Sequence, residues 1–85
     1  MLLAATASSG LAVQRDDFVA TDGQTLFLLS LVPSQPATAL VFVNGVLQLF
    51  TVDYTFSSDP AGRLNWLNTD FTLQAGDIVT AYYGV

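Results

Sequence analysis

The sequence predicts an all-β fold: a small antiparallel β-sandwich or barrel of about six to eight short strands, preceded by an extended N-terminal arm. Turn-forming residues recur at short, fairly regular intervals, and the runs between them are rich in β-branched and aromatic residues. No segment shows a sustained helical period with capping residues. A chain of 85 residues supports one small core, so we expect a single domain.

The N-terminal segment, residues 1–14, is rich in Ala, Ser, Thr and Leu and has no clear period. We expect an extended docking arm there and a single β domain over residues 15–85. Within that domain, residues 18–21 and 24–28 are predicted to be strands joined by Asp22-Gly23, because Asp-Gly suits the positive φ angles of a two-residue type I′ hairpin.

A proline-containing loop, residues 32–36, separates this hairpin from the clearest local signal in the chain. Proline donates no ladder hydrogen bond, so we expect a crossover there. Asn44-Gly45 follows, flanked by the apolar runs 39–43 and 46–50. This pattern is the strongest short-range indication of a β-hairpin.

Further strands are expected downstream, because turn-favouring residues separate the remaining apolar runs. The expected strands are residues 53–56, 64–67, 71–73 and 78–83. The last two would close the sheet as a final hairpin.

Both faces of the Asn44-Gly45 hairpin are predominantly apolar, whereas a strand pair with one solvent-exposed face should alternate apolar and polar residues. A two-residue turn places one set on one face, Leu40, Phe42, Leu47 and Leu49, and a second set on the other, which includes Val41, Val43, Val46 and Phe50. Two explanations stay open. Either the hairpin lies between two layers of its own domain, or the second face packs on another subunit.

Charge and composition exclude several classes of function. The chain has no His and no Cys, which excludes zinc fingers, disulfide scaffolds and Ser-His or Cys nucleophiles. Two Arg, no Lys and seven Asp give a net charge of −5, so the chain cannot neutralise a phosphate backbone. Its longest apolar stretches fall far below the ~20 residues of a spanning helix. We expect no nucleic-acid partner and no membrane insertion.

No constellation of side chains indicates catalysis or a cofactor. Asp16 and Asp17 are adjacent, and adjacent side chains in a strand point to opposite faces. Asp22, Asp59 and Asp77 fall in predicted turns, where a carboxylate bonds nearby backbone N–H groups. No Asp-x-Asp-x-Asp-Gly loop occurs, which leaves an ion at a subunit contact as the alternative to no metal at all. We expect a non-enzymatic protein with no cofactor and no metal site.

The composition also predicts association with other chains. Hydrophobic residues make up 52% of the chain and charged residues 11%, whereas about a quarter of a soluble domain is usually charged. So few charges on so small a protein leave apolar faces to be covered. We expect copies of the chain, or another protein, to cover them.

An ordered set of motifs resembles a small β module of tailed-bacteriophage virion proteins. The set comprises residues 18–27 with their Gly-Gln-Thr turn, Val-Asn-Gly within residues 41–47, Asp53-Tyr54-Thr55, and Ala-Gly-Asp within residues 73–79. Order and rough spacing match from Phe18 to Tyr83, most of the chain. The module recurs in tail-fibre and head-attached proteins. The resemblance implies a non-enzymatic structural role in a phage particle, often as a trimer.

We expect a capsid decoration (cement) protein on the outer surface of the virion, a homotrimer that binds the major capsid protein or another virion protein and stabilises the head. Tail fibres usually carry this module as one piece of a long chain, whereas this sequence begins at Met1 and stops just after its last expected strand. The alternative is a tail- or head-fibre module that binds a host receptor or a glycan.

Each hypothesis has its own candidate residues. Docking onto other chains is expected at apolar residues of the arm and of one hairpin face: Leu2, Leu3, Leu11, Val13, Val41, Val43, Val46 and Phe50. Glycan stacking would instead use Trp66, Tyr82 and Tyr83, because flat aromatic rings pack on sugars. The same three aromatic side chains are also suited to a core or an interface.

Overall fold

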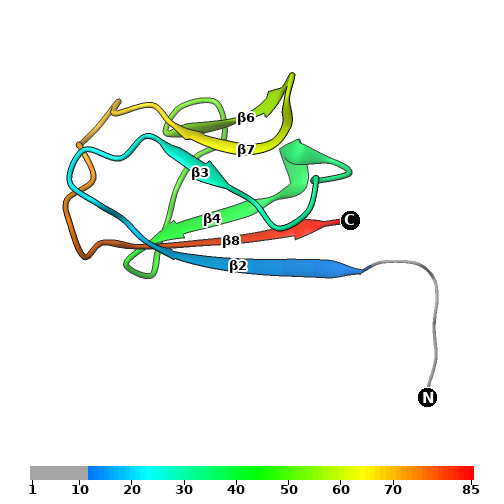
Figure 1. Cartoon of the computed structure of the whole chain (residues 1–85), viewed down its shortest axis with the longest axis horizontal. Helices are drawn as coiled ribbons and strands as arrows, with labels where there is room; N and C mark the ends of the chain where they lie inside the picture. Colours follow the sequence, from blue (N-terminus) through cyan, green and yellow to red (C-terminus); the bar gives the residue numbers. More distant parts are fainter. Residues whose placement is uncertain (1–11) are drawn as a thin grey trace, which may run out of the picture.

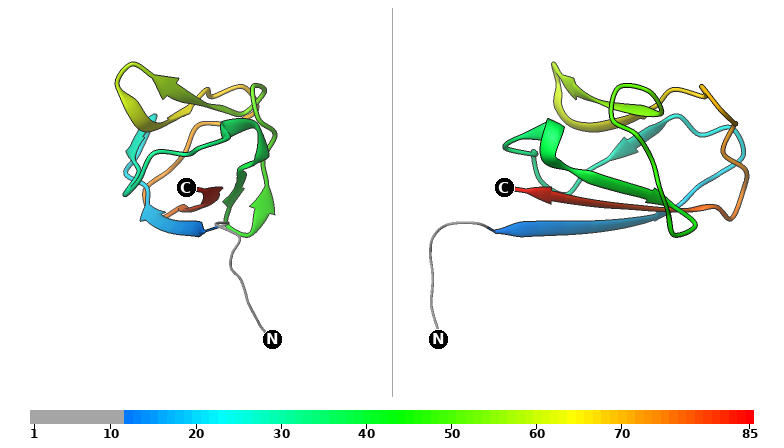
Figure 2. Two further views of the ribbon diagram at one scale, coloured as in Figure 1. Left: turned by 90° about the vertical axis from the view of Figure 1, so that its right-hand side faces the viewer. Right: turned by 180° about the vertical axis from the view of Figure 1, so that it is seen from behind.

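The computed structural model describes residues 12–85 and confirms the all-β prediction: two antiparallel sheets with seven strands pack as two layers (Figures 1 and 2). The four-stranded sheet contains, in spatial order, β2 (Val13–Val19), β8 (Ile78–Gly84), β4 (Leu40–Val43) and β5 (Val46–Leu47). The three-stranded sheet contains β3 (Leu26–Leu28), β7 (Ala61–Trp66) and β6 (Tyr54–Ser58). A single turn of 3-10 helix, η1 (Pro36–Thr38), precedes β4.

β2 begins at Val13, so residues 13 and 14, expected in the arm, belong to the sheet. They pair with the end of β8, Val13 with Gly84 and Gln14 with Tyr83. The expected arm residues Leu2, Leu3 and Leu11 lie outside the described residues. No helix within residues 12–85 has the length and apolar character to cross a membrane.

The predicted hairpin across Asp22-Gly23 is wrong. The pair does form a turn, with Gly23 at φ 73°, but β2 pairs with β8 and β3 pairs with β7, so the turn carries the chain from one sheet to the other. The reason lies in distant partners. The amide of Ala20 donates to the carbonyl of Asp77 at 2.8 Å, and that of Gly23 donates to the carbonyl of Leu73 at 2.8 Å.

The Asn44-Gly45 hairpin is confirmed. Both turn residues have positive φ, 49° at Asn44 and 82° at Gly45, as a type I′ turn requires. Phe42 pairs with Leu47 and Val43 with Val46. β5 stops after two residues, although the amide of Gln48 still donates to the carbonyl of Val41 at 2.8 Å.

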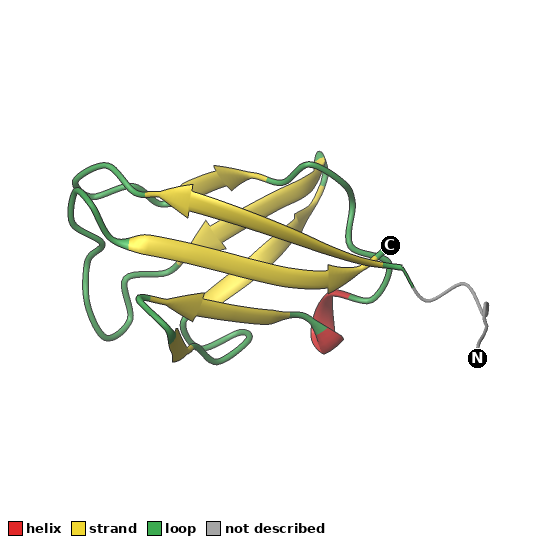
Figure 3. Ribbon diagram, turned by 90° about the horizontal axis from the view of Figure 1, so that it is seen from below, coloured by secondary structure: helices red, strands yellow, loops and turns green. Residues whose placement is uncertain are grey.

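The end of the chain departs from the prediction at one strand. β6 and β7 form the expected strand pair on either side of Asp59-Pro60, but residues 71–73 form no strand, and the expected final hairpin is wrong. β8 instead lies between β2 and β4 at the centre of its sheet (Figure 3). Leu73 is fully buried although it lies in a loop, because a side chain can be buried without its backbone pairing with a neighbouring strand.

Alternate residues of both sheets fill the space between the layers. The core consists of Phe27, Tyr54, Leu64 and Trp66 from one sheet, Val41, Val43, Val79, Ala81 and Tyr83 from the other, and Ala20, Ala39 and Leu73 from connecting segments. Each large side chain buried here stabilises the fold by roughly 1.5–3 kcal/mol. On the Val41 face of the hairpin, the chain's own second sheet therefore covers Val41 and Val43, whereas Val46 is exposed.

Candidate functional site: the outer face of the four-stranded sheet

The face of the four-stranded sheet that points away from the core carries the exposed apolar side chains of the hairpin. Along β4, Val41 is fully buried while its neighbour Leu40 is 48% exposed, which is the period of two that a pleated strand imposes. On β5, Leu47 is 50% exposed. Figure 3 looks onto this face, and no other element of residues 12–85 crosses it. We call it the outer face; its residues are Val13, Arg15, Asp17, Val19, Leu40, Phe42, Leu47, Ile78, Thr80 and Tyr82.

Tyr82 lies at the centre of the outer face. It pairs with Arg15 of β2 on one side and with Leu40 of β4 on the other. The Arg15 guanidinium carbon lies 5.5 Å from the centroid of the Tyr82 ring, within cation–π range. Phe42 meets the same ring edge-on, with centroids 5.9 Å apart. These three side chains, with Thr80 and Gly45, line a shallow hollow of about 280 Å³.

The outer face is electrically neutral because its two charges pair with each other. Arg15 Nε lies 3.1 Å from Asp17 Oδ2, and the Thr80 hydroxyl donates to Asp17 Oδ1 at 2.7 Å. The hydrogen bond from Thr80, followed by that from Arg15, lowers the pKa of Asp17. At neutral pH the pair adds no net charge, although the whole chain carries −5.

The structure places the residues predicted for docking in different environments. Val41 and Val43 are buried in the core, so neither reaches another chain. Val46 and Val13 are exposed, and Phe50 is half-buried against Tyr54, with ring centroids 5.6 Å apart. Leu40, Phe42 and Leu47, which are not among the predicted docking residues, lie on the outer face, where Leu40 and Leu47 are exposed and Phe42 is half-buried. The signal for them was present, since both hairpin faces are apolar, but the sequence does not say which face the second sheet covers.

The aromatic platform proposed for glycans is not assembled. Trp66 and Tyr83 are 3% and 2% exposed, because both point between the sheets. The Trp66 indole donates to the carbonyl of Phe71 at 3.1 Å. Tyr82 alone is partly exposed, and Arg15 lies over its ring.

Asp16 and Asp17 point to opposite faces, as their adjacency predicts, and Asp16 joins the two layers. Its carboxylate accepts hydrogen bonds from the Ser30 backbone N–H at 2.9 Å, from the Ser30 hydroxyl and from the Tyr83 phenol. The Gln14 side-chain amide donates a further bond at 3.0 Å. Burial opposes ionisation of this carboxylate, but the bonds from Ser30, Tyr83 and Gln14 prevail and lower the pKa of Asp16 to about 2. Burial, and then the bond to Asp16, raises the pKa of Tyr83 to about 12. Because donors occupy both of its oxygens, the Asp16 carboxylate links the two sheets within the fold. We call the hydrogen-bonded group of Asp16, Ser30 and Tyr83 the clasp.

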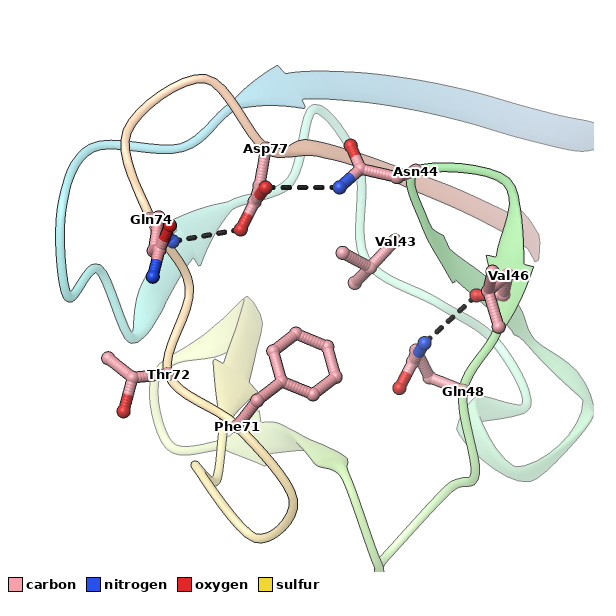
Figure 4. A pocket seen from close by; sticks show the side chains of 8 residues that line it. All are labelled: Val43, Asn44, Val46, Gln48, Phe71, Thr72, Gln74 and Asp77. Atoms are coloured by element: carbon pink, nitrogen blue, oxygen red, sulfur yellow. Dashed lines mark hydrogen bonds between the residues drawn. The ribbon is translucent and has the colours of Figure 1, made fainter.

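A second hollow, of about 390 Å³, lies between the hairpin and residues 71–77 (Figure 4). Val43 and Phe71 face it, and the Asp77 carboxylate beside them accepts two hydrogen bonds. The Asn44 side-chain amide donates to Asp77 Oδ1 at 3.0 Å, and the Gln74 backbone N–H donates to Asp77 Oδ2 at 2.8 Å. These two donors lower the pKa of Asp77, that of Gln74 having the larger effect. Asn44 therefore joins the hairpin turn to the loop before β8.

No family model, curated protein or solved structure matches this chain.

Proposed function

We propose that this chain is a non-enzymatic structural protein of a phage particle: a capsid decoration protein that associates with copies of itself through the outer face and binds the capsid through its N-terminal segment. The observation that carries the self-association is the uncovered apolar sheet face around Tyr82. The virion assignment rests on the motif resemblance. The outer face supplies the surface through which copies of the chain would contact one another.

The occupant that best suits the outer face is another copy of the same chain. Chains that each carry −5 repel one another, so a surface where copies meet has to be neutral. The outer face meets this requirement through its Arg15–Asp17 pair, while other carboxylates, such as Asp22, Asp59 and Asp70, lie in loops outside it. In the phage setting we propose a homotrimer.

The edges of the four-stranded sheet favour the same partner. β2 is an edge strand of seven residues, and Val13 and Val19 at its two ends are each 68% exposed. Long edge strands with exposed apolar residues are prone to associate. A neighbouring copy that covers the outer face next to β2 would shield both valines.

Binding to the capsid is proposed for the N-terminal segment before β2. Linking several weak arm contacts through a trimer raises the overall avidity without any new contact. Protein that binds only the assembled lattice stabilises it by mass action.

The test is the copy number of the chain in purified particles. A decoration protein is present in numbers close to those of the major capsid protein, and quantitative mass spectrometry of intact heads measures the ratio. A handful of copies confined to the tail would reject the decoration role and favour a fibre module.

A further inference from the structure

The Asn44-Gly45 turn carries a side-chain amide directly before a backbone nitrogen that can attack it. Both residues are exposed. Within residues 12–85, no carbonyl accepts a hydrogen bond from the Gly45 backbone N–H, and a Cβ built on Gly45 would meet no atom within 4 Å. The Gly45 nitrogen is therefore an unhindered neighbouring nucleophile for Asn44 Cγ, and water has open access to the turn.

Two hydrogen bonds hold the Asn44 side-chain amide against the loop before β8. Asn44 Nδ2 donates to Asp77 Oδ1 at 3.0 Å, and Asn44 Oδ1 accepts the Ile78 backbone N–H at 2.8 Å. Figure 4 shows the Asn44 and Asp77 side chains pointing toward one another. Asp77 is itself held by the Gln74 backbone N–H. Both polar atoms of the amide are thus engaged at the same time, which fixes its plane.

Attack on this amide requires it to leave that arrangement. The Gly45 nitrogen gives up its proton and bonds to Asn44 Cγ, the Cγ–Nδ2 bond breaks, and ammonia departs with the proton. Water then opens the five-membered succinimide at either carbonyl, adding OH to the carbon and H to the nitrogen, and leaves aspartate or isoaspartate. Because Cγ becomes tetrahedral during the attack, the plane fixed by the two hydrogen bonds is lost and the bonds oppose the reaction.

We propose that Asn44 is a site of spontaneous deamidation which Asp77 and the Ile78 backbone N–H restrain, so that it reacts only when the turn opens locally. The inference is independent of the proposed role in a phage particle. Once Asn44 has reacted, the link to Asp77 cannot form again. Aspartate would place a second carboxylate where the donor was. Isoaspartate would add a methylene to the backbone of the turn that pairs Val43 with Val46.

The first test measures the rate of deamidation at Asn44 in the purified full chain at pH 7, by peptide mapping with mass spectrometry. The reference is a synthetic peptide that carries residues 43–46 between solubilising lysines, in the same buffer. We expect the folded chain to react at least about tenfold more slowly than the peptide, because the turn must open first. Equal rates in chain and peptide, or no reaction in the peptide, would overturn the proposal.

Asp77→Ala locates the restraint, because it removes the acceptor of Asn44 Nδ2. We expect deamidation of Asn44 to become roughly three- to tenfold faster. Asp22→Ala, which removes a carboxylate from a different turn, should keep the wild-type rate. So should Tyr83→Phe, which removes a hydrogen bond near the other end of β8. A slower reaction in Asp77→Ala would mean that Asp77 activates the amide, and equal acceleration in Tyr83→Phe would assign the reaction to global unfolding; either result contradicts the proposal.

A second readout tests the loss of the link after reaction. Asn44→Asp reproduces the aspartate product and should unfold at a lower urea concentration than wild type, since two carboxylates replace a donor and an acceptor 3.0 Å apart. Asn68→Asp is the matched control, because Asn68 is exposed and has a similar positive φ, 55° against 49°. Its urea midpoint should stay close to that of wild type. Equal midpoints for Asn44→Asp and wild type would show that deamidation leaves the turn intact, against the proposal.

Discussion

The phenol of Tyr83 donates a hydrogen bond to the carboxylate of Asp16, which also accepts two bonds from Ser30. Tyr83 and Asp16 lie in the four-stranded sheet, whereas Ser30 follows β3 of the other sheet. The contact therefore fastens the two layers at the end of the sandwich where β2 begins. Burial of all but 2% of Tyr83 and 7% of Asp16 keeps water from competing for these bonds.

We predict that Tyr83→Phe destabilises the fold by roughly 1–3 kcal/mol, because it leaves Asp16 without one donor and the Leu31 amide without its acceptor. Urea unfolding followed by circular dichroism measures the change. Tyr82→Phe removes the neighbouring phenol from the outer face and should cost less than about 0.5 kcal/mol. Equal losses in the two variants would show that the clasp contributes nothing.

Acid should weaken the clasp in a defined range of pH. Because the pKa of Asp16 is lowered from 3.8 to about 2 on folding, its ionised form stabilises the folded state above pH 4. That contribution disappears as the pH falls from about 4 to about 2. We expect Asp16 to account for on the order of 1 kcal/mol of the acid-induced loss, after allowance for solvent screening.

Urea unfolding at pH 7, 4 and 2.5 tests this assignment. Asp16→Asn should be less stable than wild type at pH 7 and should lose less free energy of unfolding between pH 4 and 2.5. Asp17→Asn, one residue away on the exposed face, should follow the wild-type profile more closely. If Asp16→Asn loses as much stability in acid as wild type, another group controls the transition.

A side chain at the second position of the Asn44-Gly45 turn should destabilise the fold through backbone strain alone. Gly45 has φ 82° and a Cβ there would meet no atom within 4 Å, so Gly45→Ala isolates backbone strain, which we expect to cost about 1 kcal/mol. Gly84→Ala is the matched control, because Gly84 lies in β8 and its added Cβ would make ordinary contacts. It should be neutral or slightly stabilising. A comparison of the urea midpoints decides between these expectations.

Trp66 provides a direct check on the glycan hypothesis. Its indole is buried and bonded to the carbonyl of Phe71, so the fluorescence emission should be blue-shifted and poorly quenched by acrylamide. Oligosaccharides should leave the spectrum unchanged. Red-shifted emission that responds to a sugar in a saturable way would mean that Trp66 reaches the surface.

Local chemistry allowed the fold class and the Asn44-Gly45 hairpin to be predicted, because that turn depends on its own residues. The other turn, Asp22-Gly23, has similar chemistry but no hairpin, since distant carbonyls of Leu73 and Asp77 take the neighbouring amides. The β-turn and strand propensities of neighbouring residues carry no information about partners that lie so far away in the sequence. The apolar Leu73 likewise predicts a strand, but burial in a loop produces the same sequence pattern.

The candidate sites were harder to predict for a related reason. Leu40 and Val41 are equally apolar, and only the packing of the second sheet decides that Val41 is buried and Leu40 exposed. Alternation did separate Asp16 from Asp17 correctly, since that rule needs nothing beyond the strand itself.

The central claim is that copies of this chain cover the outer face, and the molar mass in solution tests it most directly. Sedimentation equilibrium of the full chain should give about three times the mass of one chain. Leu47→Asp, which places an unpaired charge on the outer face, should weaken association at least about tenfold. Leu28→Asp, at a comparably exposed leucine of the other sheet, should leave the mass unchanged. A wild-type chain that stays monomeric at tens of micromolar, or equal effects of the two variants, would contradict the account.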